Sequence, residues 1–286
     1  MKLTILLFII TVLLLVFSYQ QVPQQGMEGQ PTVSSQQTPS IIDSNAIVSD
    51  TIAWGLLSSD SEIDSINLAL ALNDAFRVAS PSFKAERFTS AYTFSPTDTS
   101  EEIDIEITVG KLLGTPQTYF LLRRWYSGTE EVYLDFYHIQ ADSSQLLLHH
   151  QQDLITYQKD TILDVNGDQQ QDFVVHWYPS AGSWSREVYT VYLNTTNNTS
   201  FAGPYTFMNP TFSPTEGLIR GRAYGDPADA GFYKYQWNGL QVDTLEYLYP
   251  HPGQVGKYFR TNQETAPLQA DNGTILDSLP LEYRGL

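Results

Sequence analysis

The sequence predicts a mainly β protein: a compact antiparallel β domain, either a sandwich or partly propeller-like, with one N-terminal helix. Most segments beyond residue 100 alternate with period two and are rich in Tyr, Val, Ile and Phe, which is typical of half-buried strands. Helical segments do not alternate regularly with them, so antiparallel pairing is favoured over a parallel α/β sheet. The strand-like segments are EIDIEITV, QTYFLLRRWY, EVYLDFYHI, SQLLLHH, DFVVHWY, EVYTVYL, GLIRGRAY, FYKYQW and LQVDTLEYLY.

The single helix is predicted over about residues 60–77. Ser59 and Glu62 have the spacing of a capping box, in which each side chain bonds a backbone N–H of the first turn. Apolar residues such as Ile63 and Ile66 then follow at helical spacing. We therefore expect the folded part of the chain to begin with this helix.

One hairpin can be placed from the sequence. Tyr233, Tyr235 and Trp237 alternate along one segment and should share a strand face. Asn238 and Gly239 follow, and this dipeptide is favoured where a two-residue turn requires two positive φ angles. We expect the turn to lie at these two residues.

Residues 1–18 have the pattern of a signal peptide, with Lys2 followed by an apolar run from Leu3 to Phe17. A run of about 15 residues is short for a membrane-spanning helix, so cleavage is favoured over an uncleaved anchor that would tether the chain. The protein is thus expected to be exported, to the periplasm or the cell exterior, without stable membrane insertion once cleaved.

The remaining chain divides by composition. Residues 19–50 are rich in Gln, Ser, Pro and Gly and predict a flexible polar linker, because they offer little apolar surface to bury. Residues 51–252 form the predicted β domain. Residues 253–286 are again polar and predict a C-terminal tail that either wraps the domain or is loose.

Net charge and cysteine content exclude several classes of function. The chain carries 32 Asp and Glu against 15 Lys and Arg, a formal net charge of −17. This field repels phosphate backbones, so nucleic-acid binding is not expected. Cysteine is absent, which removes disulfides, thiolate metal sites and cysteine nucleophiles.

The segment DVNGDQQQD, residues 164–172, predicts a calcium-binding loop. Calcium takes six to eight hard oxygen ligands, and short carboxylate and amide side chains at alternating positions can wrap them around one point. The side chains of Asp164, Asn166, Asp168 and Asp172 have this spacing, and the backbone carbonyl of Gln170 would add a further oxygen. The alternative is a turn that joins two strands, since Asp, Asn and Gly are common in turns.

The loop resembles the strand-loop-strand calcium motif of the FG-GAP and VCBS repeat families. Their pattern is Asp-x-Asp/Asn-x-Asp-Gly-x-x-Asp followed by an apolar strand, and the segment from Asp164 to Phe173 follows it except that Gln169 replaces the glycine. An EF-hand is excluded because Val175, in a strand-like segment, occupies the position where an EF-hand has its bidentate Glu. The resemblance implies a bound calcium ion that stabilises a secreted fold without disulfides.

A wider resemblance covers about residues 100–250. The acidic loop, the segment VVHWYPSAGSWSREVYTVYL and the Tyr-x-Tyr-x-Trp-Asn-Gly hairpin together are similar to exported bacterial proteins that include periplasmic lysozyme-inhibitor-like immunity proteins. This likeness implies a non-enzymatic module that binds a protein partner at the cell envelope, for example a wall-degrading glycosidase. Ser183 and Trp184 lie in a loop-like segment and are candidate partner contacts; alternatively Trp184 packs on a neighbouring strand.

The main alternative function is a secreted polysaccharide hydrolase. It would need two convergent carboxylates, and no motif identifies them among the acidic residues. His149 and His150 are adjacent, so on a strand they should point to opposite faces and cannot share one metal. His176 lies in an apolar strand pattern and is interpreted as a packed histidine rather than a zinc ligand.

Overall fold

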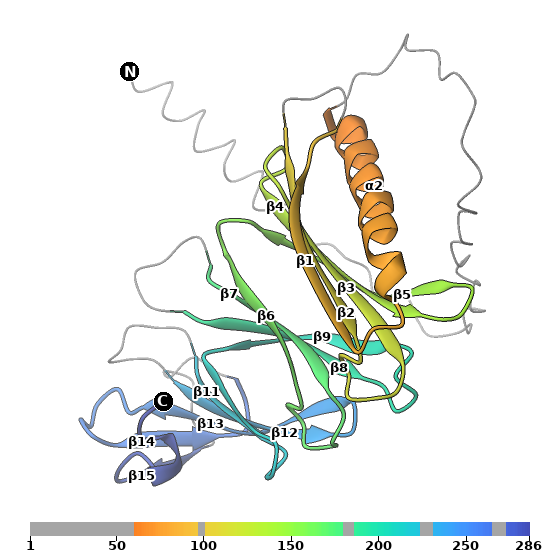
Figure 1. Cartoon of the computed structure of the whole chain (residues 1–286). Helices are drawn as coiled ribbons and strands as arrows, with labels where there is room; N and C mark the ends of the chain where they lie inside the picture. The colour runs from red at the N-terminus through yellow and green to blue at the C-terminus, as the bar shows by residue number, and fades with distance from the viewer. Residues whose placement is uncertain (1–59, 97–100, 180–185, 224–230, 265–272) are drawn as a thin grey trace, which may run out of the picture. The chain divides into compact units, whose positions relative to one another are not determined.

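The computed structural model describes residues 60–96, 101–179, 186–223, 231–264 and 273–286 (Figure 1). Within these ranges the chain forms fifteen β-strands and one α-helix, α2 (Asp60–Ala79), with short 3-10 helices at Ser80–Ser82 and Leu281–Tyr283. All strand pairs are antiparallel. The predicted mainly β class with one N-terminal helix is confirmed. The predicted signal peptide and linker lie outside the described residues.

The strands form three sheets, and in each sheet consecutive strands are neighbours. Sheet 1 contains β1 (Arg87–Phe94), β2 (Ile103–Gly110), β3 (Thr118–Tyr126), β4 (Glu131–Ile139) and β5 (Ser144–Asp153). Sheet 2 contains β6 (Tyr157–Leu163), β7 (Asp172–Trp177), β8 (Val188–Asn194) and β9 (Phe201–Met208). Sheet 3 contains β10 (Pro210–Ser213), β11 (Leu218–Arg222), β12 (Phe232–Asn238), β13 (Gln241–Pro250), β14 (Tyr258–Thr261) and β15 (Thr274–Leu276).

Clusters of buried side chains lie between successive layers. The first cluster joins α2 to sheet 1, the second joins sheet 1 to sheet 2, and the third joins sheet 2 to sheet 3. Sheets 1 and 2 are therefore covered on both faces. This explains why β4 and β7 are buried along nearly their whole length, since a strand with two buried faces needs a continuous apolar run.

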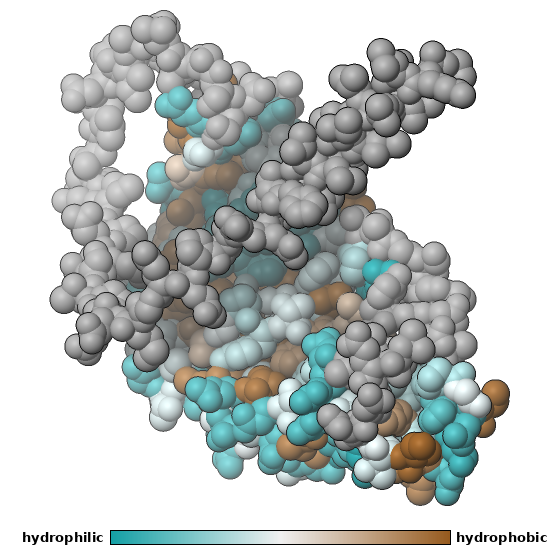
Figure 2. Space-filling model, turned by 180° about the vertical axis from the view of Figure 1, so that it is seen from behind, coloured by the Kyte–Doolittle hydropathy of each residue, from teal (hydrophilic) through white to brown (hydrophobic). Residues whose placement is uncertain are grey.

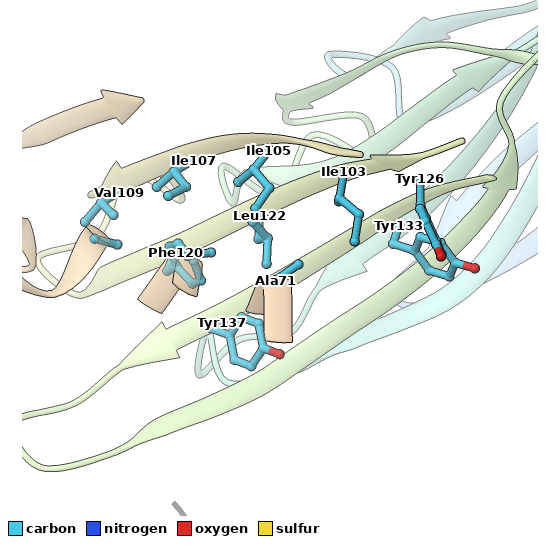
Figure 3. Packing of buried hydrophobic residues seen from close by; sticks show 12 residues of the cluster. Ala71, Ile103, Ile105, Ile107, Val109, Phe120, Leu122, Tyr126, Tyr133 and Tyr137 are labelled. Carbon is cyan, nitrogen blue, oxygen red and sulfur yellow. The ribbon is translucent and has the colours of Figure 1, made fainter. Parts of the chain in front are cut away.

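Helix α2 packs on sheet 1 through small residues. Ala71, Ala75 and Ala79 recur every four residues, so they lie on one helix face, and all three are fully buried. Figure 3 shows Ala71 near the alternate residues of β2 from Ile103 to Val109, which point toward the helix. Each buried isoleucine of that row contributes about 2 kcal/mol to folding. The helix ends two residues later than expected from the sequence.

The predicted hairpin turn is displaced by one residue. Asn238 pairs with Gln241, so the two turn residues are Gly239 and Leu240 rather than Asn238 and Gly239. Gly239 has a φ of +59°, whereas Asn238 is not among the residues with positive φ. A turn with glycine at its first position is also compatible with strand twist. The prediction that Tyr233, Tyr235 and Trp237 share a face is confirmed, because all three belong to the third cluster.

Residues 253–286, predicted as a polar tail, contribute to sheet 3. Strands β14 and β15 extend the sheet beyond β13. Tyr283 is buried and packs with Phe232 and Leu248 on sheet 3, and its hydroxyl donates to Glu246 Oε1 at 2.6 Å. Sheet 3 therefore continues past residue 252.

The exposed apolar side chains of sheet 3 and its turns are scattered. In the lower part of Figure 2, where sheet 3 lies, hydrophobic residues form separate patches among hydrophilic ones. The exposed large apolar residues of this part of the chain are Leu240, Leu245, Val255, Ile275 and Leu281. Single exposed apolar residues are normal on a protein surface. No helix within the described ranges combines the length and the apolar character that a membrane crossing requires.

Candidate metal-binding loop

The acidic loop joins β6 to β7, so it is flanked by strands as the sequence predicts. Asp164 organises its first half. Its Oδ1 accepts a hydrogen bond from the Gly167 N–H at 2.6 Å, and its Oδ2 accepts one from the Gln169 N–H at 2.9 Å. Asp side chains commonly bond backbone groups further along a turn. Here the two bonds fold the chain back around the Asp164 carboxylate.

Asn166, Asp168 and Gln170 form a second set of bonds. Asn166 Oδ1 accepts the Asp168 N–H at 3.1 Å, and Asp168 Oδ1 accepts the Gln170 N–H at 2.8 Å. Asp168 Oδ2 accepts from Asn166 Nδ2 at 3.1 Å and from Gln170 Nε2 at 3.2 Å. The Oε1 atom of Gln170 is buried and has no hydrogen-bond partner among the described residues. The loop thus contains one oxygen acceptor that its own hydrogen bonds leave unused.

Asp172 anchors the loop to sheet 2. It is fully buried at the start of β7. Its Oδ2 accepts the Val165 N–H at 3.0 Å, and its Oδ1 accepts the Asn194 N–H at 2.9 Å. Burial raises the pKa of this carboxyl to about 7, and the charges of Asp168 and Asp164 add to the rise, while the two N–H donors oppose it. A buried carboxylate near two others favours a nearby cation.

Two loop residues have left-handed backbone. Gly167 has a φ of +84° and Gln169 a φ of +68°. A Cβ atom at position 167 would clash with the carbonyl oxygen of Pro214, in the turn between β10 and β11. Gly167 therefore allows the loop to lie directly against sheet 3. Gln169, which replaces the glycine of the resembled motif, adopts the same conformation with a side chain present.

The donor chemistry of the loop fits calcium. All the candidate ligands are oxygens, as hard cations require. Among the residues that the structure describes, Asp164, Asp168 and Asp172 form no ion pair with a basic side chain. In the same part of the chain, no group of three or more His, Cys, Asp or Glu side chains is placed to hold a metal ion. The carboxylates lie near one another without converging, and the calcium ion stays a prediction.

Ser183 and Trp184, the predicted partner contacts, lie outside the described residues. The histidines occupy the positions expected from strand alternation. His149 Nδ1 lies 2.6 Å from Asp135 Oδ1, whereas His150 is buried and its Nδ1 lies 2.7 Å from the hydroxyl of Tyr192. His176 is buried and stacks on Tyr189, with ring centroids 4.5 Å apart.

A cavity of about 530 Å³ lies between sheets 1 and 2. If the protein were a hydrolase, its two carboxylates would need to meet in such a cavity. The two carboxylates of the cavity belong to Glu86 and Asp160. Asp160 is paired with Arg123, whose Nε and Nη2 atoms lie 2.5 and 2.6 Å from its two oxygens. Glu86 is 83% exposed. A glycosidase needs an acid and a base that can exchange protons with the substrate, and a carboxylate held by a guanidinium does not suit either role.

Sequence reasoning did not identify Asn194 and Pro214, which fix the loop to β8 and to the β10–β11 turn. Asn194 contacts the loop through its backbone N–H and Pro214 through its backbone carbonyl. Because any residue has a backbone carbonyl and nearly any has an N–H, the residue types at these positions do not predict the contacts. The Arg123–Asp160 pair was also missed. It joins β3 of sheet 1 to β6 of sheet 2. The sequence of one strand does not indicate which residue of the other strand will be its partner.

The chain has a distant likeness to a solved structure. No family model matches the chain, and no curated protein does. A solved structure described as "Structure of a Xanthomonas Type IV Secretion System related protein" is similar to 66% of this chain and 99% of its own, with 13% sequence identity and a TM-score of 0.33. At this TM-score the likeness carries no argument about fold or function.

Proposed function

We propose that this protein is an exported, non-enzymatic β module that is stabilised by one calcium ion at residues 164–172 and binds a protein partner at the cell envelope. The observation that carries the metal part is Asp172, a fully buried carboxylate beside Asp164 and Asp168 with no basic partner among the described residues. A divalent cation would offset the repulsion among the three charges and the cost of burying one of them.

The loop residues also explain why a cation would stabilise the whole domain. Asp172 is bonded to β8 through Asn194, and Gly167 lies against Pro214 of sheet 3. An ion held by Asp164, Asn166, Asp168, Asp172 and the Gln170 carbonyl would therefore fix a loop that contacts two sheets. With a dissociation constant of about 10⁻⁴ M and calcium at about 1 mM, binding would add about 1.4 kcal/mol to the free energy of unfolding.

The metal part is tested by the melting temperature of the full chain in calcium, in magnesium and in a chelator. For a domain of this size we expect calcium to raise the melting temperature by about 3 to 6 °C. The shift should disappear in Asp168→Ala. It should persist in Asp142→Ala, which removes an exposed carboxylate from the β4–β5 turn. An equal shift in both variants, or no shift, contradicts the proposal.

The partner part is a separate proposal and rests on the resemblance and on the segment that contains Ser183 and Trp184. It is tested by adding the purified chain to a lysozyme acting on bacterial wall and measuring the rate of lysis. We expect inhibition that is lost in Trp184→Ala and retained in Leu240→Ala, an exposed apolar residue elsewhere. Lysis at an unchanged rate would refute the inhibitor role and leave the calcium result unaffected.

A further inference from the structure

The cavity between sheets 1 and 2 has a fixed polar wall. Arg123 and Asp160 line it as an ion pair, with side chains that are 16% and 2% exposed. Arg123 Nη1 also donates to Thr108 Oγ1 at 3.3 Å, and the Tyr157 hydroxyl donates to Asp160 Oδ1 at 2.8 Å. The guanidinium and the carboxylate thus orient each other, and Thr108 and Tyr157 add one further hydrogen bond to each. Such a wall needs no rearrangement before a ligand binds.

At the rim of the cavity Glu86, Arg87 and Lys111 together carry one net positive charge. Arg87 and Lys111 lie at the start of β1 and just after β2. Lys111 is 3.9 Å from Glu86, a long contact to a side chain that is 83% exposed. Within the described ranges Arg87 forms no ion pair. In a chain of net charge −17, this rim is a place where an anion is attracted rather than repelled.

An apolar strip completes the lining. It consists of Leu112 in the β2–β3 connection and Ile162 of β6, together with Leu121 of β3, which is 1% exposed. The cavity volume of about 530 Å³ is within the range of sites for small molecules, which combine an apolar lining with a few placed polar groups. The cavity therefore offers a cationic edge, a fixed polar wall and an apolar surface to one bound molecule.

We propose that this cavity binds a small amphipathic carboxylic acid. The carboxylate meets Arg87 and Lys111, and the apolar body of the ligand covers Leu112 and Ile162. This site is separate from the acidic loop, although Gln171, the last residue before β7, also lines the cavity. The inference does not depend on calcium or on a protein partner.

The ligand chemistry is tested by titrating the full chain with three probes. Phenylacetate carries both features, phenylacetamide replaces the charge with a neutral amide, and acetate lacks the apolar body. We expect phenylacetate to bind one site with a dissociation constant of about 1 mM. The two other probes should bind at least about tenfold more weakly. No saturable binding of phenylacetate, or equal binding of phenylacetamide, would overturn the proposal.

The location is tested by charge reversal with a matched control. Lys111→Glu should lower the affinity for phenylacetate at least about tenfold. Lys257→Glu is the control, because Lys257 is also 39% exposed and also has a single ion pair with a mostly exposed acid. It should change the affinity less than about twofold. If both variants weaken binding equally, net charge rather than the cavity attracts the ligand and the assignment fails. Lys111→Gln repeats the test if the reversed charge prevents folding.

Discussion

Replacing Gln169 with glycine should stabilise this protein. Gln169 has a φ of +68°, in the left-handed region, where a residue with a Cβ is strained by about 1 to 2 kcal/mol. The side chain is exposed, and the hydrogen bond at this position comes from the backbone N–H to Asp164, which glycine retains. Glycine adds entropy to the unfolded chain, which costs about 0.5 to 1 kcal/mol. From the middle of each range, the expected net gain is about 0.75 kcal/mol.

The assay is urea unfolding of the full chain in the presence of a chelator, so that any metal contribution is removed. Gln171→Gly is the control, since residue 171 is not among those with positive φ. There glycine brings the entropic cost without relieving strain, and we expect a loss of about 0.5 to 1 kcal/mol. If Gln169→Gly lowers the free energy of unfolding as much as Gln171→Gly does, the backbone of the loop is not strained and the reasoning is wrong.

Three further substitutions test the packing of the loop and of sheets 1 and 2. Gly167→Ala should lower the free energy of unfolding by more than about 2 kcal/mol, because the new Cβ meets the Pro214 carbonyl at a left-handed position; thermal melting checks this. Asp172→Ala should cost about 2 to 4 kcal/mol in urea unfolding, since two backbone N–H groups lose their acceptor. His150 gives a pH dependence, because burial lowers its pKa to about 4. The stability that neutral His150 provides is present above its unfolded pKa of about 6.5 and is lost as the pH falls toward 4, so His150 alone should cost about 2 kcal/mol between about pH 7 and about pH 5. Asp172, whose pKa is raised to about 7, acts in the opposite direction over the same interval, so the effect is measured as the difference between the protein and His150→Gln in parallel urea titrations. That difference should change by about 2 kcal/mol from pH 7 to pH 5, and a difference that is constant with pH would contradict the role of His150.

The sequence predicts the elements of this fold better than their arrangement. Period-two alternation locates the strands because it reflects the burial of one strand face, and the capping spacing at Ser59 and Glu62 locates the start of the helix because it reflects hydrogen bonding within the first turn. The order of the layers follows from long-range packing, which no single strand reveals. The hairpin shows the limit at short range: Asn238-Gly239 predicts the turn to within one residue, but the turn residues are Gly239 and Leu240 because Asn238 pairs with Gln241.

For the acidic loop, too, the sequence predicts the position but not the contacts with other strands. The spacing of Asp164, Asn166, Asp168 and Asp172 places the loop between two strands, and the structure shows that it lies there. What the spacing does not contain is that Asp172 is oriented by Asn194 of β8. Its carboxylate therefore accepts hydrogen bonds from both the loop, at Val165, and sheet 2, at Asn194. A motif describes ligands along one segment, whereas the convergence of the oxygens depends on neighbouring strands.

The most direct test of the calcium proposal is an NMR titration that follows the backbone amides of the full, metal-free chain as calcium is added. The amides of Gly167, Gln169 and Gln170, which donate to Asp164 and Asp168, should shift saturably with a dissociation constant of about 10⁻⁴ M. Magnesium should have a weaker effect because the loop ligands suit a larger ion. If these amides keep their positions at millimolar calcium, the loop is a hydrogen-bonded turn between β6 and β7 and the proposed metal does not bind there.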